Sequence, residues 1–173
     1  MVRSDARENR DRILRAAREA FADDPAVSTN QVAQRAGVGA GTLYRHFPTR
    51  EALVLAVYRS EVDRLLDQVD PLLEAHPPLE ALRAWILDLV EAMRRKHGLG
   101  DALSPAAHDA VAQETYDPVV EAFTRLLDAG KAAGMLRDDA DPRDLVQFTS
   151  ALWRAAPERT EPMVDLLIDG LKT

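Results

Sequence analysis

STNQVAQRAGVGAGTLYRHFPTREAL, residues 28–53, predicts two short helices joined by a tight turn. Ser28 is followed three residues later by Gln31, which is the pattern of a capping box that opens a helix over 29–36. Gly37 is placed to end this helix, because glycine readily adopts the left-handed conformation that follows many helices. The segment therefore predicts a compact helical hairpin with a glycine at its corner.

The second short helix follows Gly39, ends at Pro48 and has one polar face. Its side chains Thr42 and Arg45 lie roughly opposite its apolar ones. In a helix-turn-helix this polar face enters the major groove of DNA, while the ends of neighbouring helices contact phosphates. The spacing alone fits a plain helical hairpin equally well. The residues expected to face inward are Val32, Ala36, Val38, Leu43 and Phe47.

The rest of the chain has the pattern of helix throughout, because apolar residues recur every three or four positions and the breaks carry capping residues. Three helix starts are marked by a capping residue followed by proline, at Ser104-Pro105, Asp117-Pro118 and Asp141-Pro142. We therefore predict an all-α fold of about nine helices with essentially no strand. Outside the hairpin, the expected helices span 10–22, 49–69, 79–96, 105–113, 118–133, 142–156 and 161–171.

Charge is distributed unevenly along the chain. Residues 1–50 carry nine arginines and six carboxylates, a net charge of +3, whereas residues 51–173 carry a net charge of −10. A basic end can neutralise DNA phosphates even though the whole chain is acidic. Ahead of the first expected helix, Arg3, Arg7 and Arg10 fit either a flexible arm that reaches along DNA or a solvated tail.

Composition and motifs argue against several other classes of protein. The absence of cysteine excludes disulfides and zinc fingers and favours the reducing cytoplasm. A polar N-terminus and the lack of a long apolar window predict neither a signal peptide nor a membrane span. We find no GxSxG or HExxH motif, and Gly39-x-Gly41 follows a helix rather than a strand, so we expect no enzyme, no cofactor and no metal site. His97 and His108 could still meet in space, although surface or pocket histidines are favoured over a metal site.

GVGAGTLYRHFPTREAL, residues 37–53, together with Ala33, resembles the signature of the TetR family of bacterial helix-turn-helix regulators. The resemblance implies a homodimer that binds a palindromic DNA operator and leaves it when a small molecule fills a pocket in the body, the part of the chain that follows the DNA-binding residues. Most such proteins repress transcription. It also implies a DNA-binding domain over 1–50, a linking helix over about 49–69, and an effector-binding and dimerisation domain over 51–173. The matching residues are Ala33, Gly37-Val38, Gly41-Thr42-Leu43-Tyr44, His46-Phe47 and Arg50-Glu51-Ala52-Leu53.

Carried over by position, the resemblance implies DNA contacts on the two short helices and at the start of the next one. Hydroxyl groups there can donate to phosphate oxygens, and Arg45 suits guanine because a guanidinium matches the O6 and N7 acceptors. The tip Gly39-Ala40-Gly41 departs from the polar residues that many relatives carry, so only Ala40 can meet a base there, at a thymine methyl. Partial burial of Tyr44 and a scaffold role for His46 stay open. The expected DNA-binding residues are Thr29, Asn30, Ala40, Gly41, Thr42, Tyr44, Arg45, His46 and Arg50.

Two groups of apolar residues in the body are candidates for ligand binding and assembly. The first group lies on helices that surround the ligand cavity in the family, although core packing explains it equally well: Trp85, Leu89, Met93, Phe123 and Trp153. The last two expected helices are apolar on more than one side, and such helices need two partners. The expected dimer interface therefore comprises Leu145, Phe148, Leu152, Met163, Leu167 and Leu171.

The sequence thus predicts a transcriptional regulator whose partners are a double-stranded DNA operator, a small-molecule effector and a second copy of the chain. The expected helix over 49–69 begins at the DNA-binding residues and runs into the effector-binding domain. Its tilt can therefore couple effector binding to the spacing of the two DNA-binding domains, or heads, of the dimer. The alternative is a helical module that binds a ligand or a partner and has weak or lost DNA affinity, because its recognition tip is Gly-Ala-Gly.

Overall fold

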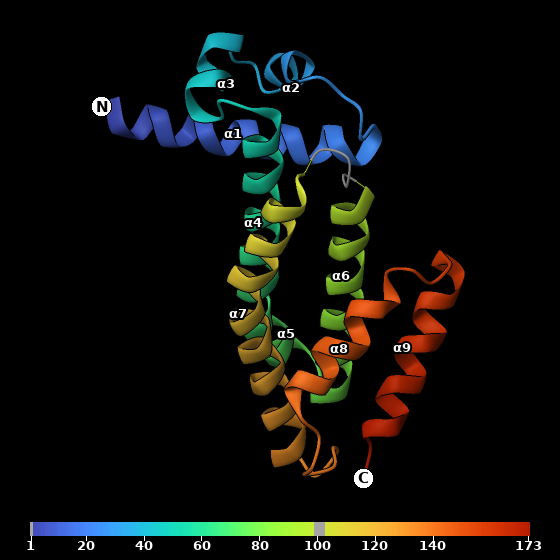
Figure 1. Ribbon diagram of the computed structural model, residues 1–173. Helices are drawn as coiled ribbons and strands as arrows, with labels where there is room; N and C mark the ends of the chain where they lie inside the picture. Colours follow the sequence, from blue (N-terminus) through green and yellow to red (C-terminus); the bar gives the residue numbers. More distant parts are fainter. Residues whose placement is uncertain (1, 99–102) are drawn as a thin grey trace. The chain divides into compact units, whose positions relative to one another are not determined.

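The structure is a computed structural model that describes residues 2–98 and 103–173, with side chains for 6–96 and 103–173. This described part contains nine helices and no strand, so the prediction of an all-α fold is confirmed (Figure 1). The side chains of Arg3 and His97 lie outside the described residues. The helices are α1 (Val2–Asp23), α2 (Thr29–Arg35), α3 (Ala40–His46), α4 (Arg50–Asp67), α5 (Val69–Ala75), α6 (Pro78–Gly98), α7 (Pro105–Ala132), α8 (Pro142–Leu152) and α9 (Pro157–Leu171).

The helices assemble into two compact units, each with its own apolar core. The first unit comprises Met1–Glu61 and Arg95–Val111, and the second comprises Val62–Arg94 and Ala112–Thr173. Apolar residues of α1 to α4 form the core of the first unit, and apolar residues of α4 to α9 form the core of the second. The predicted domain boundary at residue 50 stays a prediction.

Local sequence signals position α2 and α3 on α1 in the first unit. The Ser28 side chain accepts from the Gln31 backbone N–H at 3.3 Å, while Gln31 Oε1 accepts from the Ser28 N–H at 3.0 Å, which confirms the capping box. Gly37 has a φ of 66°, the left-handed conformation that the turn requires. The Val38 N–H then donates to the Ala33 carbonyl and closes the corner.

The N-terminal helix is longer than predicted. α1 begins at Val2, so Arg7 and Arg10 lie on a helix, and neither a flexible arm nor a solvated tail describes them. The segment 2–9 contains no glycine or proline and includes the helix formers alanine, arginine and glutamate, so its propensity favours continuation of the helix. The Arg10 guanidinium lies 5.6 Å from the centre of the Phe47 ring, which anchors this helix to the end of α3.

Two predicted helix divisions were wrong, and the errors cancel in the helix count. The predicted helix over 49–69 ends two residues early as α4, and the prediction lacked the short helix α5, which holds Pro71 in its first turn, where a missing N–H costs no hydrogen bond. The segments 105–113 and 118–133 instead form the single helix α7, with Pro118 inside it. The ring removes one intrahelical hydrogen bond, but burial of Phe123, Leu126 and their neighbours on α7 outweighs that loss.

A smaller correction concerns the helices near the C-terminus. α8 ends at Leu152, and α9 begins at Pro157, whereas the prediction placed these points at residues 156 and 161. Pro157 occupies the first turn of a helix and does not terminate the one before it.

Replacing Pro118 by alanine is expected to raise the free energy of unfolding by about 1–3 kcal/mol, because alanine restores a backbone donor inside α7. Pro105→Ala is the matched control: at the first position of the same helix, proline costs no hydrogen bond, and the change should stay within about 0.5 kcal/mol. Urea unfolding at one protein concentration measures both variants. Equal or lower stability of Pro118→Ala would contradict this explanation.

Candidate nucleic-acid interface

Two buried side chains fix the orientation of α3. Leu43 is fully buried and Phe47 is 3% exposed, and both belong to the core that α1 and α2 build. Because α3 has only seven residues, this burial holds it in place more than its own hydrogen bonds do. The side chains on its other face, Thr42, Tyr44 and Arg45, consequently remain accessible at the surface.

Hydroxyl groups from α2 and α3 meet on this surface. Thr29 Oγ1 and the Tyr44 hydroxyl are 2.9 Å apart, although they lie 15 residues apart in sequence. Tyr44 is 44% exposed, so the partial burial considered for it leaves its hydroxyl within reach of a partner. Asn30 lies next to this pair and is exposed. The start of α2 and the middle of α3 therefore present adjacent hydroxyls suited to phosphate oxygens.

The Arg45 side chain lies along its own helix. Its Nε donates to the Gly41 carbonyl at 3.1 Å, and its Nη2 donates to Thr42 Oγ1 at 3.3 Å. Both contacts are exposed, so the guanidinium can exchange them for a partner at little cost. A Cβ added at Gly39 or Gly41 would meet nothing within 4 Å, so packing inside the chain does not explain these glycines. Together with the exposed Ala40, they leave the N-terminal tip of α3 without a polar side chain.

His46 and Arg50 contact the first unit's own core or backbone. The half-buried His46 ring lies 6.2 Å from the Phe47 ring, centre to centre, an arrangement that suits the scaffold role. Arg50 donates from Nη1 to the Val27 carbonyl and from Nη2 to the Pro25 carbonyl. Its guanidinium also lies 5.1 Å from the centre of the Phe21 ring. In this structure Arg50 therefore ties the loop between α1 and α2 to the start of α4, a role that the sequence did not suggest.

The sequence also did not predict the contact between Glu51 and Ser104. The Glu51 carboxylate accepts hydrogen bonds from Ser104 N at 2.8 Å and Ser104 Oγ at 2.7 Å. These two bonds hold the pKa of Glu51 below its usual value. Ser104 was predicted as a helix cap from its Pro105 neighbour, and its Oγ does accept from the Ala107 N–H at 3.3 Å; its second partner, Glu51, lies 53 residues away and leaves no local signal.

The candidate effector residues pack in the core of the second unit, apart from one. The Trp85 and Phe123 rings meet edge to face at 4.9 Å, and Trp85 Nε1 donates to the Leu65 carbonyl at 2.8 Å. Leu89 and Met93 belong to the same cluster. Trp153 instead follows the end of α8, with the Arg154 guanidinium 4.9 Å from its ring centre. The structure thus brings four of the five together as packed core, and the effector pocket stays a prediction.

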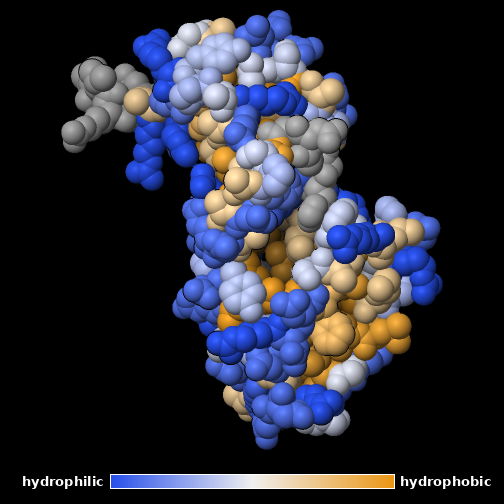
Figure 2. All heavy atoms as spheres, in the orientation of Figure 1, coloured by the Kyte–Doolittle hydropathy of each residue, from blue (hydrophilic) through white to orange (hydrophobic). Residues whose placement is uncertain are grey.

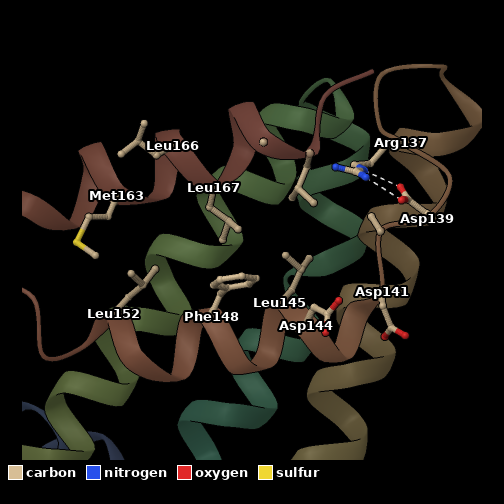
Figure 3. A pocket seen from close by; sticks show the side chains of 13 residues that line it. Arg137, Asp139, Asp141, Asp144, Leu145, Phe148, Leu152, Met163, Leu166 and Leu167 are labelled. Carbon is tan, nitrogen blue, oxygen red and sulfur yellow. Dashed lines mark hydrogen bonds and ion pairs between the residues drawn. The ribbon is translucent and has the colours of Figure 1, made fainter.

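The candidate dimer residues line an apolar groove between α8 and α9 (Figure 3). The groove has a volume of about 600 Å³ and includes all six predicted interface residues. Phe148 and Leu166 are 60% and 68% exposed, and apolar side chains gather over this part of the surface (Figure 2). Val164, Ile168 and Leu171 hold the opposite face of α9 inward by their burial, and Arg83 on α6 also contacts Asp165 and Glu161 at 2.6 and 3.1 Å. The exposed apolar face is therefore a fixed feature of the second unit.

Two other kinds of feature are absent from the residues that the structure describes. Among the residues described, no three or more histidines and carboxylates are placed to hold a metal ion. None of the described helices is both long enough and apolar enough to cross a membrane.

Comparisons with known proteins agree with this geometry. The family model "Bacterial regulatory proteins, tetR family" matches residues 13–57, and the model "Transcriptional regulator SbtR-like, C-terminal domain" matches residues 77–173. The solved TetR regulator SCO0520 of Streptomyces coelicolor is 39% identical with a TM-score of 0.81, covering 94% of this chain and 98% of that one. A TetR regulatory protein of Mycobacterium vanbaalenii is 35% identical with a TM-score of 0.78 over the full length of both chains.

Among curated proteins, the chain is 34% identical over 91 residues to the HTH-type transcriptional repressor KstR2 of Mycolicibacterium smegmatis. The match covers 51% of this chain and 44% of that protein, so the chain spans less than half the length of this relative.

The hairpin of α2 and α3, anchored by its buried apolar side chains and polar on its accessible face, defines a helix-turn-helix protein of the DNA-binding class. With the matches to both family models and to the two solved regulators, the chain belongs to the TetR family of bacterial transcriptional regulators. Members of this family are DNA-binding transcription factors and not enzymes.

Arg50→Ala is expected to lower the free energy of unfolding of the free protein by about 1–3 kcal/mol, because two backbone carbonyls lose a charged donor. Arg50→Lys should recover only part of this loss, since an ammonium cannot reproduce the two-pronged contact. Arg45→Ala is the matched control, and its exposed contacts predict a change within about 0.5 kcal/mol. Urea unfolding without DNA measures all three variants, and wild-type stability of Arg50→Ala would refute the tie.

Proposed function

We propose that this protein is a repressor that binds a palindromic operator as a homodimer and is released by a small-molecule effector. The observation that carries the proposal is the buried anchoring of α3 by Leu43 and Phe47, which leaves Thr42, Tyr44 and Arg45 available to DNA. The net charge of +3 on residues 1–50 supports phosphate contact at this end of the chain. The repressor name of the M. smegmatis relative supports the direction of regulation.

The proposed contacts fall into two kinds. The Thr29 and Tyr44 hydroxyls, with Asn30 and Thr42 beside them, contact phosphates and fix the position of α3 in the groove. Arg45 leaves Gly41 and reads a guanine, and Ala40 contacts a thymine methyl. His46 and Arg50 hold the head together, and Arg50 adds positive charge near the DNA backbone. Bare glycines on either side of Ala40 allow the helix tip to approach the bases closely.

The proposed dimer forms across the groove between α8 and α9. Exposed Phe148 and Leu166 from each copy enter the groove of the other, so that four helices share one apolar seam. Contiguous exposed apolar surface of this kind marks protein interfaces in other proteins. Two heads carried by one dimer then read two half-sites about 34–36 Å apart.

The proposed effector is small and largely apolar, and it binds in the second unit near Trp85 and Phe123. Because the two rings are in edge-to-face contact, an effector can enter at this point only if one ring is displaced. Binding is therefore coupled to a rearrangement of the helices that carry the rings. α4 links the two units covalently over 18 residues, roughly 27 Å. A tilt of α4 changes the separation of the two heads, and DNA and effector then lower each other's affinity by the same factor.

Selection from a random duplex library is expected to enrich a palindrome that binds two chains, with affinity that falls steeply as salt rises. If the dimer contacts six or more phosphates, affinity should fall by about 10³-fold or more between 50 and 200 mM salt. Tyr44→Phe should weaken binding to all duplexes alike, whereas Arg45→Ala should relax preference at one base pair by about 1–3 kcal/mol.

Arg159→Ala on α9 provides the control for that experiment, since this exposed cation lies in the second unit and should leave binding unchanged. Failure to enrich any palindrome at low salt would favour the alternative function, a helical binding module without useful DNA affinity. An equal loss of affinity for every sequence in Arg45→Ala would reassign Arg45 to a phosphate.

Phe148→Glu and Leu166→Glu are each expected to give folded monomers. Both side chains are mostly exposed in the single chain, so a carboxylate there costs little until the second copy buries it. Met135→Glu is the matched control, because Met135 is 38% exposed and lies outside the groove. Sedimentation with circular dichroism measures mass and folding together, and intact dimers in both groove variants would move the interface elsewhere.

A further inference from the structure

A second cavity, of about 130 Å³, lies wholly within the first unit. It is lined by α1, α4, the C-terminal end of α6 and Leu103, which precedes α7. Its apolar walls come from Phe21, Val54, Val57 and Leu103, all of them buried. None of the roles proposed above for DNA binding, effector binding or assembly uses this cavity.

The charged groups around the cavity do not balance. Glu61, which is 4% exposed, accepts from Arg95 Nε at 3.2 and 3.4 Å through its two carboxylate oxygens, so this pair is internally neutralised. Arg18 and Lys96 also line the cavity, and within the part of the chain that the structure describes neither forms an ion pair. The cavity wall therefore carries an excess of positive charge over an apolar floor.

Lys96 is held in an unusual position for a lysine. Its side chain is half-buried, and its ammonium lies 4.6 Å from the centre of the Tyr58 ring. Burial lowers the pKa of Lys96, because the charged form has lost part of its hydration. An aromatic face compensates only part of that loss, whereas an anion against the ammonium would compensate more of it.

We propose that this cavity binds a small monocarboxylate, with its carboxylate at Lys96 and Arg18 and its short apolar tail against Phe21, Val54 and Val57. The volume equals that of about four water molecules in the liquid, which limits the tail to roughly two to four carbons. A dicarboxylate would have to place its second charge against the apolar walls, and phosphate has no apolar tail to cover them, so both are disfavoured. This ligand is distinct in size, charge and place from the apolar effector proposed for the second unit.

Titration of the full chain with butyrate, followed by amide NMR spectra without DNA, tests the proposal directly. Butyrate should shift resonances of residues around the cavity, with a dissociation constant on the order of 1 mM for a ligand of this size. Butyramide, which has the same shape without the charge, should bind at least tenfold more weakly, and inorganic phosphate should also bind more weakly. Equal binding of butyramide, or tighter binding of phosphate at the same residues, would overturn the assignment.

Variants separate the cavity from nonspecific charge effects. Lys96→Met keeps the length of the side chain and removes the charge, and we expect at least tenfold weaker butyrate binding. Arg18→Gln should weaken binding in the same direction and serves if Lys96→Met does not fold. Lys172→Met, which removes an exposed lysine of the second unit, is the control and should bind as the wild type does. Wild-type affinity in Arg18→Gln and in folded Lys96→Met would overturn the proposal, and the readout does not depend on DNA binding.

Discussion

Burial of Leu43 and Phe47 is the constraint on which the whole of the proposed DNA-binding surface depends. A helix of seven residues has little stability of its own, so its orientation follows from what it buries. Once these two side chains enter the core, helical geometry directs Thr42 and Arg45 away from it. Arg10 and Arg50 strengthen the same arrangement, because their guanidinium groups lie over Phe47 and Phe21 at the edge of this core.

The second unit follows the same principle, but with a surplus of apolar surface. Leu145, Val164 and Ile168 are buried within the unit, while Phe148 and Leu166 on the same two helices remain mostly exposed. Burial of Val164, Ile168 and Leu171 fixes which side of α9 faces inward, so the exposed side cannot be hidden by rotation of the helix. Exposed apolar area of this kind has no stabilising role in a single chain, and it is why we propose a second copy as its cover.

Much of the fold was predictable because its signals are local. The capping box at Ser28, the turn at Gly37 and the polar face of α3 each depend on residues only a few positions apart. The helix break predicted at Pro118 was wrong because a proline indicates only the local cost of a missing hydrogen-bond donor. The burial that keeps α7 continuous comes from contacts with residues distant in sequence. Breaks between helices were therefore the least predictable part of the fold.

The site was predictable at the level of faces but not of contacts. The sequence placed the candidate DNA residues on one surface, but the bonds of Arg50 to carbonyls 23 and 25 residues away have no local pattern. The same holds for the Glu51–Ser104 contact and for the meeting of Thr29 with Tyr44. Large apolar side chains such as Trp85 and Phe123 are equally typical of a packed core and of a ligand-binding pocket, so the sequence could not separate these two roles.

We propose that the accessible face of α2 and α3 is the surface that meets DNA. Amide hydrogen exchange of the full chain, with and without a saturating palindromic duplex at low salt, tests it most directly. We predict that added protection concentrates in Thr29–Arg35 and Ala40–His46, with little change in the second unit beyond α4. Protection that leaves these two helices unchanged and appears elsewhere would contradict the account.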